Sequence, residues 1–199
     1  MNDKPDPEKA APTASEAEWP AFPTPPKEVV FAVGVVAVSY NALESLFFAL
    51  FALVTGIPSH LQSALFQRLA NNERVDLVRA ALGGNKWPEE TIVLFEHFLA
   101  GYDICAANRN VLMHSIAGIG EEPTPLTKFT KRGSMEVLPT SLDNIRRAAD
   151  DIASFSTYGV TLAGRLMTNR MDDGRFDPAA RLPWPEKPPL PHKLRYTRN

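Results

Sequence analysis

The sequence predicts an all-α protein: an antiparallel bundle of four to five helices with a small β-hairpin before the last long helix. Long segments carry apolar residues at helical spacing, and Gly and Pro separate these segments from one another. Of the 18 prolines, seven lie in residues 1–27 and six in residues 178–199. Because proline breaks helices, long helices are expected only between these two ends.

The chain of 199 residues accordingly divides into three parts. We expect residues 1–27 to be a disordered proline-rich tail and residues 171–199 to be an extended proline-rich tail. Residues 28–170 form the predicted helical domain, which is long enough to bury a core of its own.

The first predicted helix spans residues 27–55 and ends where Gly56 and Pro58 interrupt it. Apolar residues cover nearly its whole circumference, which predicts burial in the core of the bundle. A transmembrane span is the alternative, since the segment is long enough to cross a bilayer. Asn41 and Glu44 near its middle argue against this, because a carboxylate at the bilayer centre costs roughly 2.5–3.5 kcal/mol. We therefore expect no membrane association.

Three further elements complete the predicted fold. The second helix begins at Ser59, in a capping-box pattern, and ends at Gly83-Gly84, and the third runs from Pro88 to about Ser115. Residues 126–130 and 135–138 form the predicted hairpin. The fourth long helix begins at the cap pattern of residues 140–143.

Composition and motifs exclude several classes of function. A net charge of −2 argues against a surface that is wholly a nucleic-acid footprint. The single Cys105 excludes an intramolecular disulfide and fits a reducing, cytoplasmic compartment. The sequence lacks a Walker loop, a G-x-G-x-x-G and a G-x-S-x-G, and none of its histidines follows a glutamate by three residues. We therefore expect no metal and no cofactor.

One constellation at the end of the third helix points to chemistry. Arg109 falls on the apolar stripe of that helix, where a charge is costly without a partner, and His114 follows five residues later. Arginine binds phosphate oxygens in pairs, and histidine exchanges a proton near neutral pH. RNA carries its own nucleophile, the 2'-hydroxyl, so such a pair can cleave RNA without a metal.

These residues resemble the R-x(4–6)-H signature of HEPN domains (higher eukaryotes and prokaryotes nucleotide-binding domains), in which a polar residue such as Asn110 follows the arginine. The first helix, with Tyr40, Asn41 and Glu44, is similar to the opening helix of small bacterial HEPN-like proteins. The resemblance covers about residues 29–167.

The resemblance implies a homodimer in which the two motifs meet across the dimer axis. It implies a metal-independent endoribonuclease that leaves 2',3'-cyclic phosphate ends. Such an enzyme is the toxin or effector of a toxin–antitoxin or phage-defence system, with RNA as substrate and an antitoxin protein as a further partner.

The resemblance also assigns roles to residues. Arg109 stabilises the pentacovalent phosphate, and His114 is the general acid or base. Asn110 positions phosphate or ribose. The other supporting residues are Glu44 and Asn41, expected to orient Arg109, together with Tyr40 and Ser115.

A non-catalytic interpretation stands beside this one: a homodimeric interaction or regulatory protein of the same fold that keeps the motif for folding. In that case Arg109 forms a buried ion pair with Glu44 or Asp103, and His114 caps the third helix.

Overall fold

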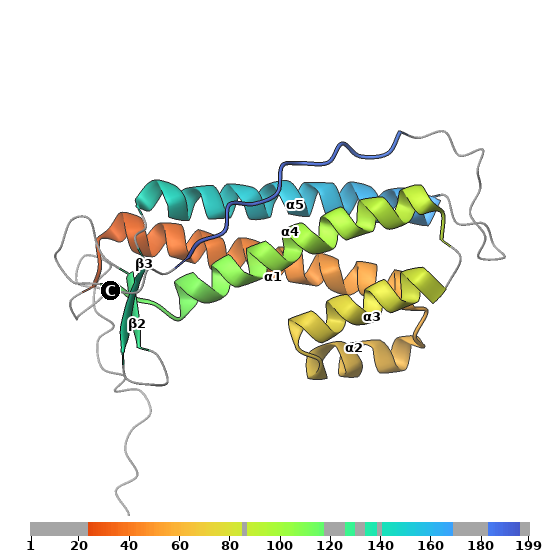
Figure 1. Ribbon diagram of the computed structural model, residues 1–199, viewed down its shortest axis with the longest axis horizontal. Helices are drawn as coiled ribbons and strands as arrows, with labels where there is room; N and C mark the ends of the chain where they lie inside the picture. Colours follow the sequence, from red (N-terminus) through yellow and green to blue (C-terminus); the bar gives the residue numbers. More distant parts are fainter. Residues whose placement is uncertain are drawn as a thin grey trace, which may run out of the picture.

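The part of the chain that the structure describes is mainly helical, with five helices packed together (Figure 1). The computed structural model describes residues 24–84, 87–117, 126–129, 134–138, 141–168 and 183–195. The predicted helical bundle with a hairpin before the last long helix is confirmed. The elements are α1 (Lys27–Thr55), α2 (Ser59–Arg68), α3 (Asn71–Gly84), α4 (Glu89–Met113), β1 (Ile116–Ala117), β2 (Leu126–Phe129), β3 (Met135–Leu138) and α5 (Leu142–Thr168).

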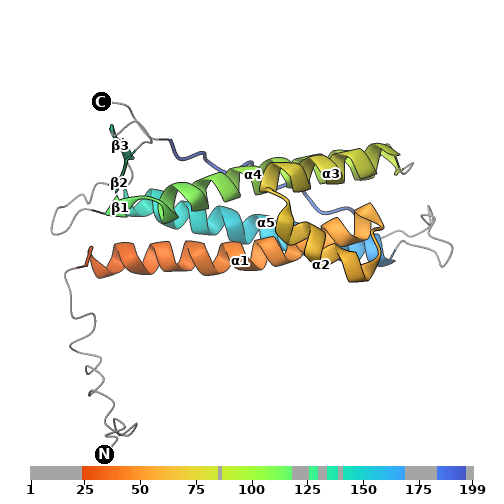
Figure 2. The same ribbon diagram turned by 90° about the horizontal axis from the view of Figure 1, so that it is seen from below.

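The three long helices α1, α4 and α5 form the body of the bundle. α4 runs opposite to both α1 and α5, whereas α1 and α5 run in the same direction (Figures 1 and 2). α1 and α5 also share the most extensive contact between any two described elements. Gly159 allows this approach, since a Cβ there would lie 2.6 Å from the Phe98 ring and 2.7 Å from Leu46. The expected antiparallel packing therefore holds for α4 against its neighbours, and the α1–α5 pair is parallel.

α1 is apolar on two opposite faces, and only one of them is buried. The other face exposes four residues, Val30, Phe31, Val35 and Val38, at 49%, 74%, 37% and 72%. We call these four residues the α1 apolar stripe. α1 is also the one described helix long and apolar enough to cross a bilayer by length and composition. The prediction of a core helix is right for the first face and wrong for the stripe. The buried face consists of Ala32, Val36, Tyr40, Leu43, Phe47, Leu50, Phe51 and Val54.

The predicted second helix is two helices. Leu69 adopts an extended backbone (φ −80°, ψ 140°) and ends α2. A Glu73 carboxylate oxygen then accepts the backbone N–H of Ala70 at 2.7 Å, which is the glutamate half of a capping box at the start of α3. The capping box predicted at Ser59 is not formed, because the Gln62 amide donates to the Ile57 carbonyl instead.

The boundaries of the later elements follow the predictions closely. The Ser141 hydroxyl accepts the backbone N–H of Asn144, as a cap for α5 should. β2 and β3 pair antiparallel with Thr127 opposite Val137, and β1 adds a third strand that the sequence did not predict. Residues 130–133, which include the predicted turn, lie outside the described residues.

Residues 183–195 cross the bundle as an extended segment, which we call the C-terminal strap (Figure 1). Leu194 is buried in the core, and Trp184 packs against the core. His97 on α4 lies 2.7 Å from the Pro188 carbonyl oxygen through Nε2. Sequence analysis gave no docking site for this part of the predicted tail. The rest of the predicted tails, residues 1–23, 171–182 and 196–199, lies outside the described residues.

Candidate functional site

Arg109 lies on α4 one turn after the buried Cys105 and is half-buried. Its guanidinium carbon lies 5.8 Å from the centre of the Tyr40 ring, a cation–π distance, and Nη1 donates to Oδ1 of Asn110 at 3.1 Å. The buried Nε has no hydrogen-bond partner among the described residues. The positive charge therefore has a ring and one neutral amide as neighbours, with no ion-pair partner in the described part of the chain.

His114 is exposed and directly follows the last residue of α4. Its backbone (φ −102°, ψ 7°) leaves the regular helix, and its N–H still donates to the carbonyl of Asn110. The hydroxyl of the half-buried Ser115 donates to the Val111 carbonyl. Arg109, Asn110, His114 and Ser115 thus lie together at the carboxyl-terminal end of α4, with the imidazole open to solvent.

The residues expected to orient Arg109 lie elsewhere or have other partners. Oε1 of Glu44 accepts a hydrogen bond from Nη1 of Arg74 at 2.8 Å, which forms an ion pair between α1 and α3. Asn41 is exposed, and only its backbone carbonyl has a described contact, with the Ser45 hydroxyl. The expected support of Arg109 by Glu44 and Asn41 is therefore wrong, because Arg74, on the helix split from the predicted second one, takes the carboxylate. The alternative ion pair between Arg109 and Glu44 or Asp103 is not formed among the described residues either.

Five residues from three helices form a hydrogen-bonded group, which we call the polar cluster: Tyr40, Glu44, Asn71, Arg74 and Tyr102. The Tyr40 hydroxyl donates to that of Tyr102 at 3.1 Å and accepts from Nδ2 of Asn71 at 3.3 Å. Oδ1 of Asn71 in turn accepts from Arg74 at 3.1 Å. The cluster connects α1, α3 and α4 through hydrogen bonds. It lies next to Arg109, because Tyr40 is a member of the cluster and its ring also contacts Arg109.

Burial raises the pKa of both tyrosines in the cluster. For Tyr102 the neighbouring Tyr40 and Glu44 raise the pKa further, while Arg74 opposes the shift. For Tyr40 the hydrogen bonds from its neighbours and the Arg109 charge only partly oppose the effect of burial. Both phenols therefore keep their protons near neutral pH, and Tyr40 presents a neutral ring to Arg109 instead of a base.

Asn108, next to the motif, is the functional-looking residue that sequence analysis left without a role. It is 1% exposed, its Nδ2 donates to the His192 carbonyl at 2.7 Å, and its Oδ1 accepts the Leu194 N–H at 2.9 Å. The His192 N–H also donates to Asp151 on α5 at 3.2 Å. Asn108 therefore fixes the C-terminal strap beside the carboxyl-terminal half of α4. Two features of the sequence could have indicated this docking. Helical spacing places Asn108 on the buried side of its helix, and the apolar residues Trp184 and Leu194 lie among the prolines of the tail.

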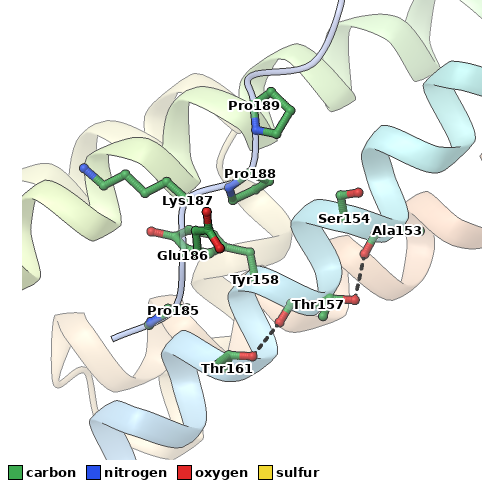
Figure 3. Close-up of a pocket in the computed structure, with 10 residues that line it drawn as sticks. All are labelled: Ala153, Ser154, Thr157, Tyr158, Thr161, Pro185, Glu186, Lys187, Pro188 and Pro189. Atoms are coloured by element: carbon green, nitrogen blue, oxygen red, sulfur yellow. Dashed lines mark hydrogen bonds between the residues drawn. The ribbon is translucent and has the colours of Figure 1, made fainter. Parts of the chain in front are cut away.

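Described residues line two of the pockets in the structure. The larger, of about 690 Å³, is open and lies between α5 and the strap, and none of its lining residues belongs to the predicted site (Figure 3). The hydroxyls of Thr157 and Thr161 in it donate to the carbonyls of Ala153 and Thr157, as Figure 3 shows. The smaller, of about 290 Å³, lies beside the ion pair of Glu44 and Arg74.

Within the described residues, no three His, Cys, Asp or Glu side chains gather as they would around a metal ion. No family model matches the chain, and searches of curated proteins and of solved structures gave no match either. The geometry around Arg109 and His114 is therefore what indicates a function.

Proposed function

We propose that this protein is a metal-independent endoribonuclease of HEPN type that acts as a homodimer, with Arg109 and His114 in its active site. The observation that carries the proposal is the state of Arg109: a half-buried guanidinium with a buried, unpartnered Nε and no carboxylate partner among the described residues. A cation in that state favours an anionic ligand, and a phosphodiester is the ligand whose geometry its planar fork matches.

The proposed reaction uses the substrate's own nucleophile. The 2'-oxygen attacks the adjacent phosphorus and loses its proton to a general base, while the bond from phosphorus to the 5'-oxygen breaks and that oxygen takes up a proton. The products are a 2',3'-cyclic phosphate and a 5'-hydroxyl. His114, exposed at the end of α4, serves as the general acid or base, and Arg109 stabilises the negative charge of the pentacovalent phosphate.

Asn110 and Ser115 have supporting roles in this proposal. The Asn110 side chain holds Nη1 of Arg109, and its backbone carbonyl accepts the N–H of His114, so this one residue contacts both proposed active-site residues. Ser115 fastens the chain to the last turn of α4 just after the histidine. Tyr40 orients Arg109 through its ring.

The α1 apolar stripe supports a dimer. Its four side chains are too exposed for a helix that is otherwise core, and a second copy would remove them from water. The stripe lies in the amino-terminal half of α1, at the end of the bundle where α4 ends (Figure 2). Two copies joined there would have both α4 ends at the interface end of the dimer, with the paired α1 helices between them. Val38→Asp is expected to turn the dimer into a monomer in light scattering, whereas Val160→Asp, on the exposed side of α5, should leave it intact.

The test of the activity is cleavage of total RNA by the purified protein in EDTA. We expect cleavage to cyclic phosphate ends, reduced by about 10²- to 10⁴-fold in His114→Ala. His60→Ala, which removes an exposed histidine from α2, is the matched control and should cleave like the parent. If the folded parent protein cleaves no RNA, or if His114→Ala cleaves as fast as the parent, the nuclease proposal is wrong.

An antitoxin partner and a role in toxin–antitoxin or phage defence remain extensions of this proposal. They follow from the resemblance to the family alone. Expression of the parent and of His114→Ala in bacteria tests them, since only the parent should arrest growth.

A further inference from the structure

The smaller pocket lies between α1, α2 and α3 and is partly polar. Its volume of about 290 Å³ is close to the lower end of the roughly 300–1,000 Å³ typical of small-ligand sites. Acidic, basic, amide, hydroxyl and aromatic groups all contribute to its wall. The lining residues are Glu44, Ser45, Phe48, Ser63, Phe66, Gln67 and Arg74.

Flat side chains form one part of this wall. The Arg74 guanidinium carbon lies 4.0 Å from the centre of the Phe66 ring. The Phe48 ring meets Phe66 edge-on, with centroids 5.1 Å apart. Aromatic rings and guanidinium planes are the surfaces on which proteins stack single unpaired RNA bases.

The ion pair supplies hydrogen-bonding groups in addition. Oε1 of Glu44 is held by Arg74, and Oε2 has no hydrogen-bond partner among the described residues. The Arg74 side chain is 12% exposed; its Nη1 bonds Glu44 and Asn71 and its Nε is buried, so Nη2, which has no partner among the described residues, is the donor left for a ligand. The pocket therefore offers a carboxylate acceptor directly beside a guanidinium donor, and both have hydrogen-bonding capacity left.

The pocket is close to the proposed phosphate site. Glu44 is one helical turn, about 6 Å, after Tyr40 on α1, and the Tyr40 ring lies against Arg109. The path from Arg109 to Glu44 adds this turn of helix to the 5.8 Å between Arg109 and the Tyr40 ring, and one nucleotide spans a distance of that order between its phosphate and its base.

We propose that the pocket lined by Glu44, Phe66 and Arg74 binds one base of the RNA substrate and selects guanine. Guanine is the RNA base whose Watson–Crick edge presents two N–H donors beside one carbonyl acceptor. Glu44 accepts from those donors, Arg74 donates to the carbonyl oxygen, and the half-buried Phe48 side chain packs against the base, while Phe66 supports Arg74 from beneath. This inference deepens the proposed nuclease function and rests on it for the identity of the ligand.

The test is calorimetric titration of the full chain with the 3'-monophosphates of guanosine, adenosine, cytidine and uridine. We expect saturable binding of the guanosine nucleotide, with each of the other three bound about tenfold more weakly or worse. Glu44→Gln should weaken guanosine nucleotide binding by about tenfold or more, because it removes a charged acceptor. Glu96→Gln is the matched control, since it removes a carboxylate paired with Arg79 outside the pocket, and should bind like the parent.

A second variant keeps the test decisive if Glu44→Gln does not fold. Ser63 is exposed and lines the pocket, so Ser63→Trp fills the space while keeping both residues of the ion pair, and should abolish binding. The inference is overturned if no nucleotide binds, if another nucleotide binds as tightly as the guanosine one, or if binding survives in Ser63→Trp.

These outcomes are separable from those of the nuclease proposal. RNA cleavage in EDTA without nucleotide binding in this pocket refutes the base site alone. Binding of the guanosine nucleotide by a protein that cleaves no RNA refutes the nuclease alone.

Discussion

Arg74 and Arg109 are both connected to Tyr40, Arg74 through Asn71 and Arg109 through the ring, but they differ in how their charges are compensated. Arg74 is paired with the Glu44 carboxylate at 2.8 Å, hydrogen-bonded to Asn71 and packed on Phe66. Arg109 has one neutral hydrogen bond, to Asn110, and the Tyr40 ring at 5.8 Å. Both guanidinium groups have a buried Nε without a partner among the described residues.

The difference separates a cation whose charge the fold already neutralises from one whose charge it leaves uncompensated. A buried charge that is paired contributes to the fold, because removing it leaves the partner charge uncompensated. A half-buried charge without a counter-ion costs stability in the free protein and is compensated only when an anion binds. Arg74 therefore supports the fold through Glu44, whatever it donates to the proposed base, whereas Arg109 is the cation that awaits a phosphate.

The largest expected effect is on Arg109. Arg109→Ala should reduce RNA cleavage by about 10²- to 10³-fold, the usual loss when one stabilising donor is removed from a transition state. Its free energy of unfolding should change by about 1 kcal/mol or less, because only one neutral hydrogen bond is lost. Cleavage rates at saturating RNA and urea unfolding measure the two quantities. Arg68→Ala, on the exposed surface of α2, is the control, and a variant that unfolds easily while cleaving normally would reverse the assignment.

Arg74 should show the opposite pattern. Arg74→Ala leaves Glu44 without its partner and uncovers Phe66, so we expect a loss of about 2–3 kcal/mol in the free energy of unfolding. Arg79→Ala breaks the exposed pair with Glu96 and should cost less than about 1 kcal/mol. Urea unfolding of both variants checks the ranking. Equal losses would mean that the polar cluster has no special structural role.

A third, smaller effect concerns the strap. Asn108→Ala removes two hydrogen bonds to the strap and should cost about 1–2 kcal/mol. Amide exchange should become faster at Leu194, whose N–H the Asn108 side chain accepts, and remain slow in the core of α5. Asn72→Ala, an exposed asparagine on α3, provides the comparison. Unchanged exchange at Leu194 would show that the prolines hold the strap without Asn108.

The smallest expected effect is on the pH dependence of stability, through the carboxylate of Asp151. Burial raises the pKa of Asp151, and the His192 N–H and Arg147 only partly oppose this. The folded state therefore holds the Asp151 proton more tightly than the unfolded state does, so ionisation costs stability above the folded pKa. Stability is regained as the pH falls through the raised pKa toward the unfolded value near about 4.

Asp151→Asn should remove that dependence and keep an acceptor for His192. We expect a gain well below about 1 kcal/mol at neutral pH, since water screens much of the charge. Urea unfolding at about pH 7 and about pH 5 measures it, with Asp143→Asn, an exposed aspartate of α5 that does not shift the Asp151 pKa, as the control. The parent protein should gain stability relative to Asp151→Asn when the pH is lowered from about 7 to about 5. A parent protein that instead loses stability relative to the variant over this change would contradict the sign of the effect.

The sequence predicted those elements whose signals are local. Gly56 and Pro58 marked the end of α1, Ser141 marked the start of α5, and two short segments flanking residues 131–134 marked the hairpin. The break between α2 and α3 was missed because Ala70 is a poor cap residue and hid the contribution of Glu73. Helical periodicity continued across it and favoured one long helix.

The site was predictable only in part, for a related reason. Arg109 and His114 were recognisable because they share one helix with a known spacing. The partner of Glu44 was not, because Arg74 reaches Glu44 from α3 across 30 positions of sequence. The strap was missed because polar anchors such as Asn108 fix it, and a lone amide leaves no periodic pattern.

The strap also constrains the order in which the chain can fold. Its hydrogen bonds to α4 join residues 84–91 positions apart, from His97 and Asn108 to Pro188, His192 and Leu194. Such distant contacts carry a loop-closure cost that is repaid only when their target surface already exists. That surface consists of α4 and α5, so the strap should dock after these helices have paired. Once docked, it has to detach before α4 and α5 can separate, so it should slow unfolding more than it speeds folding.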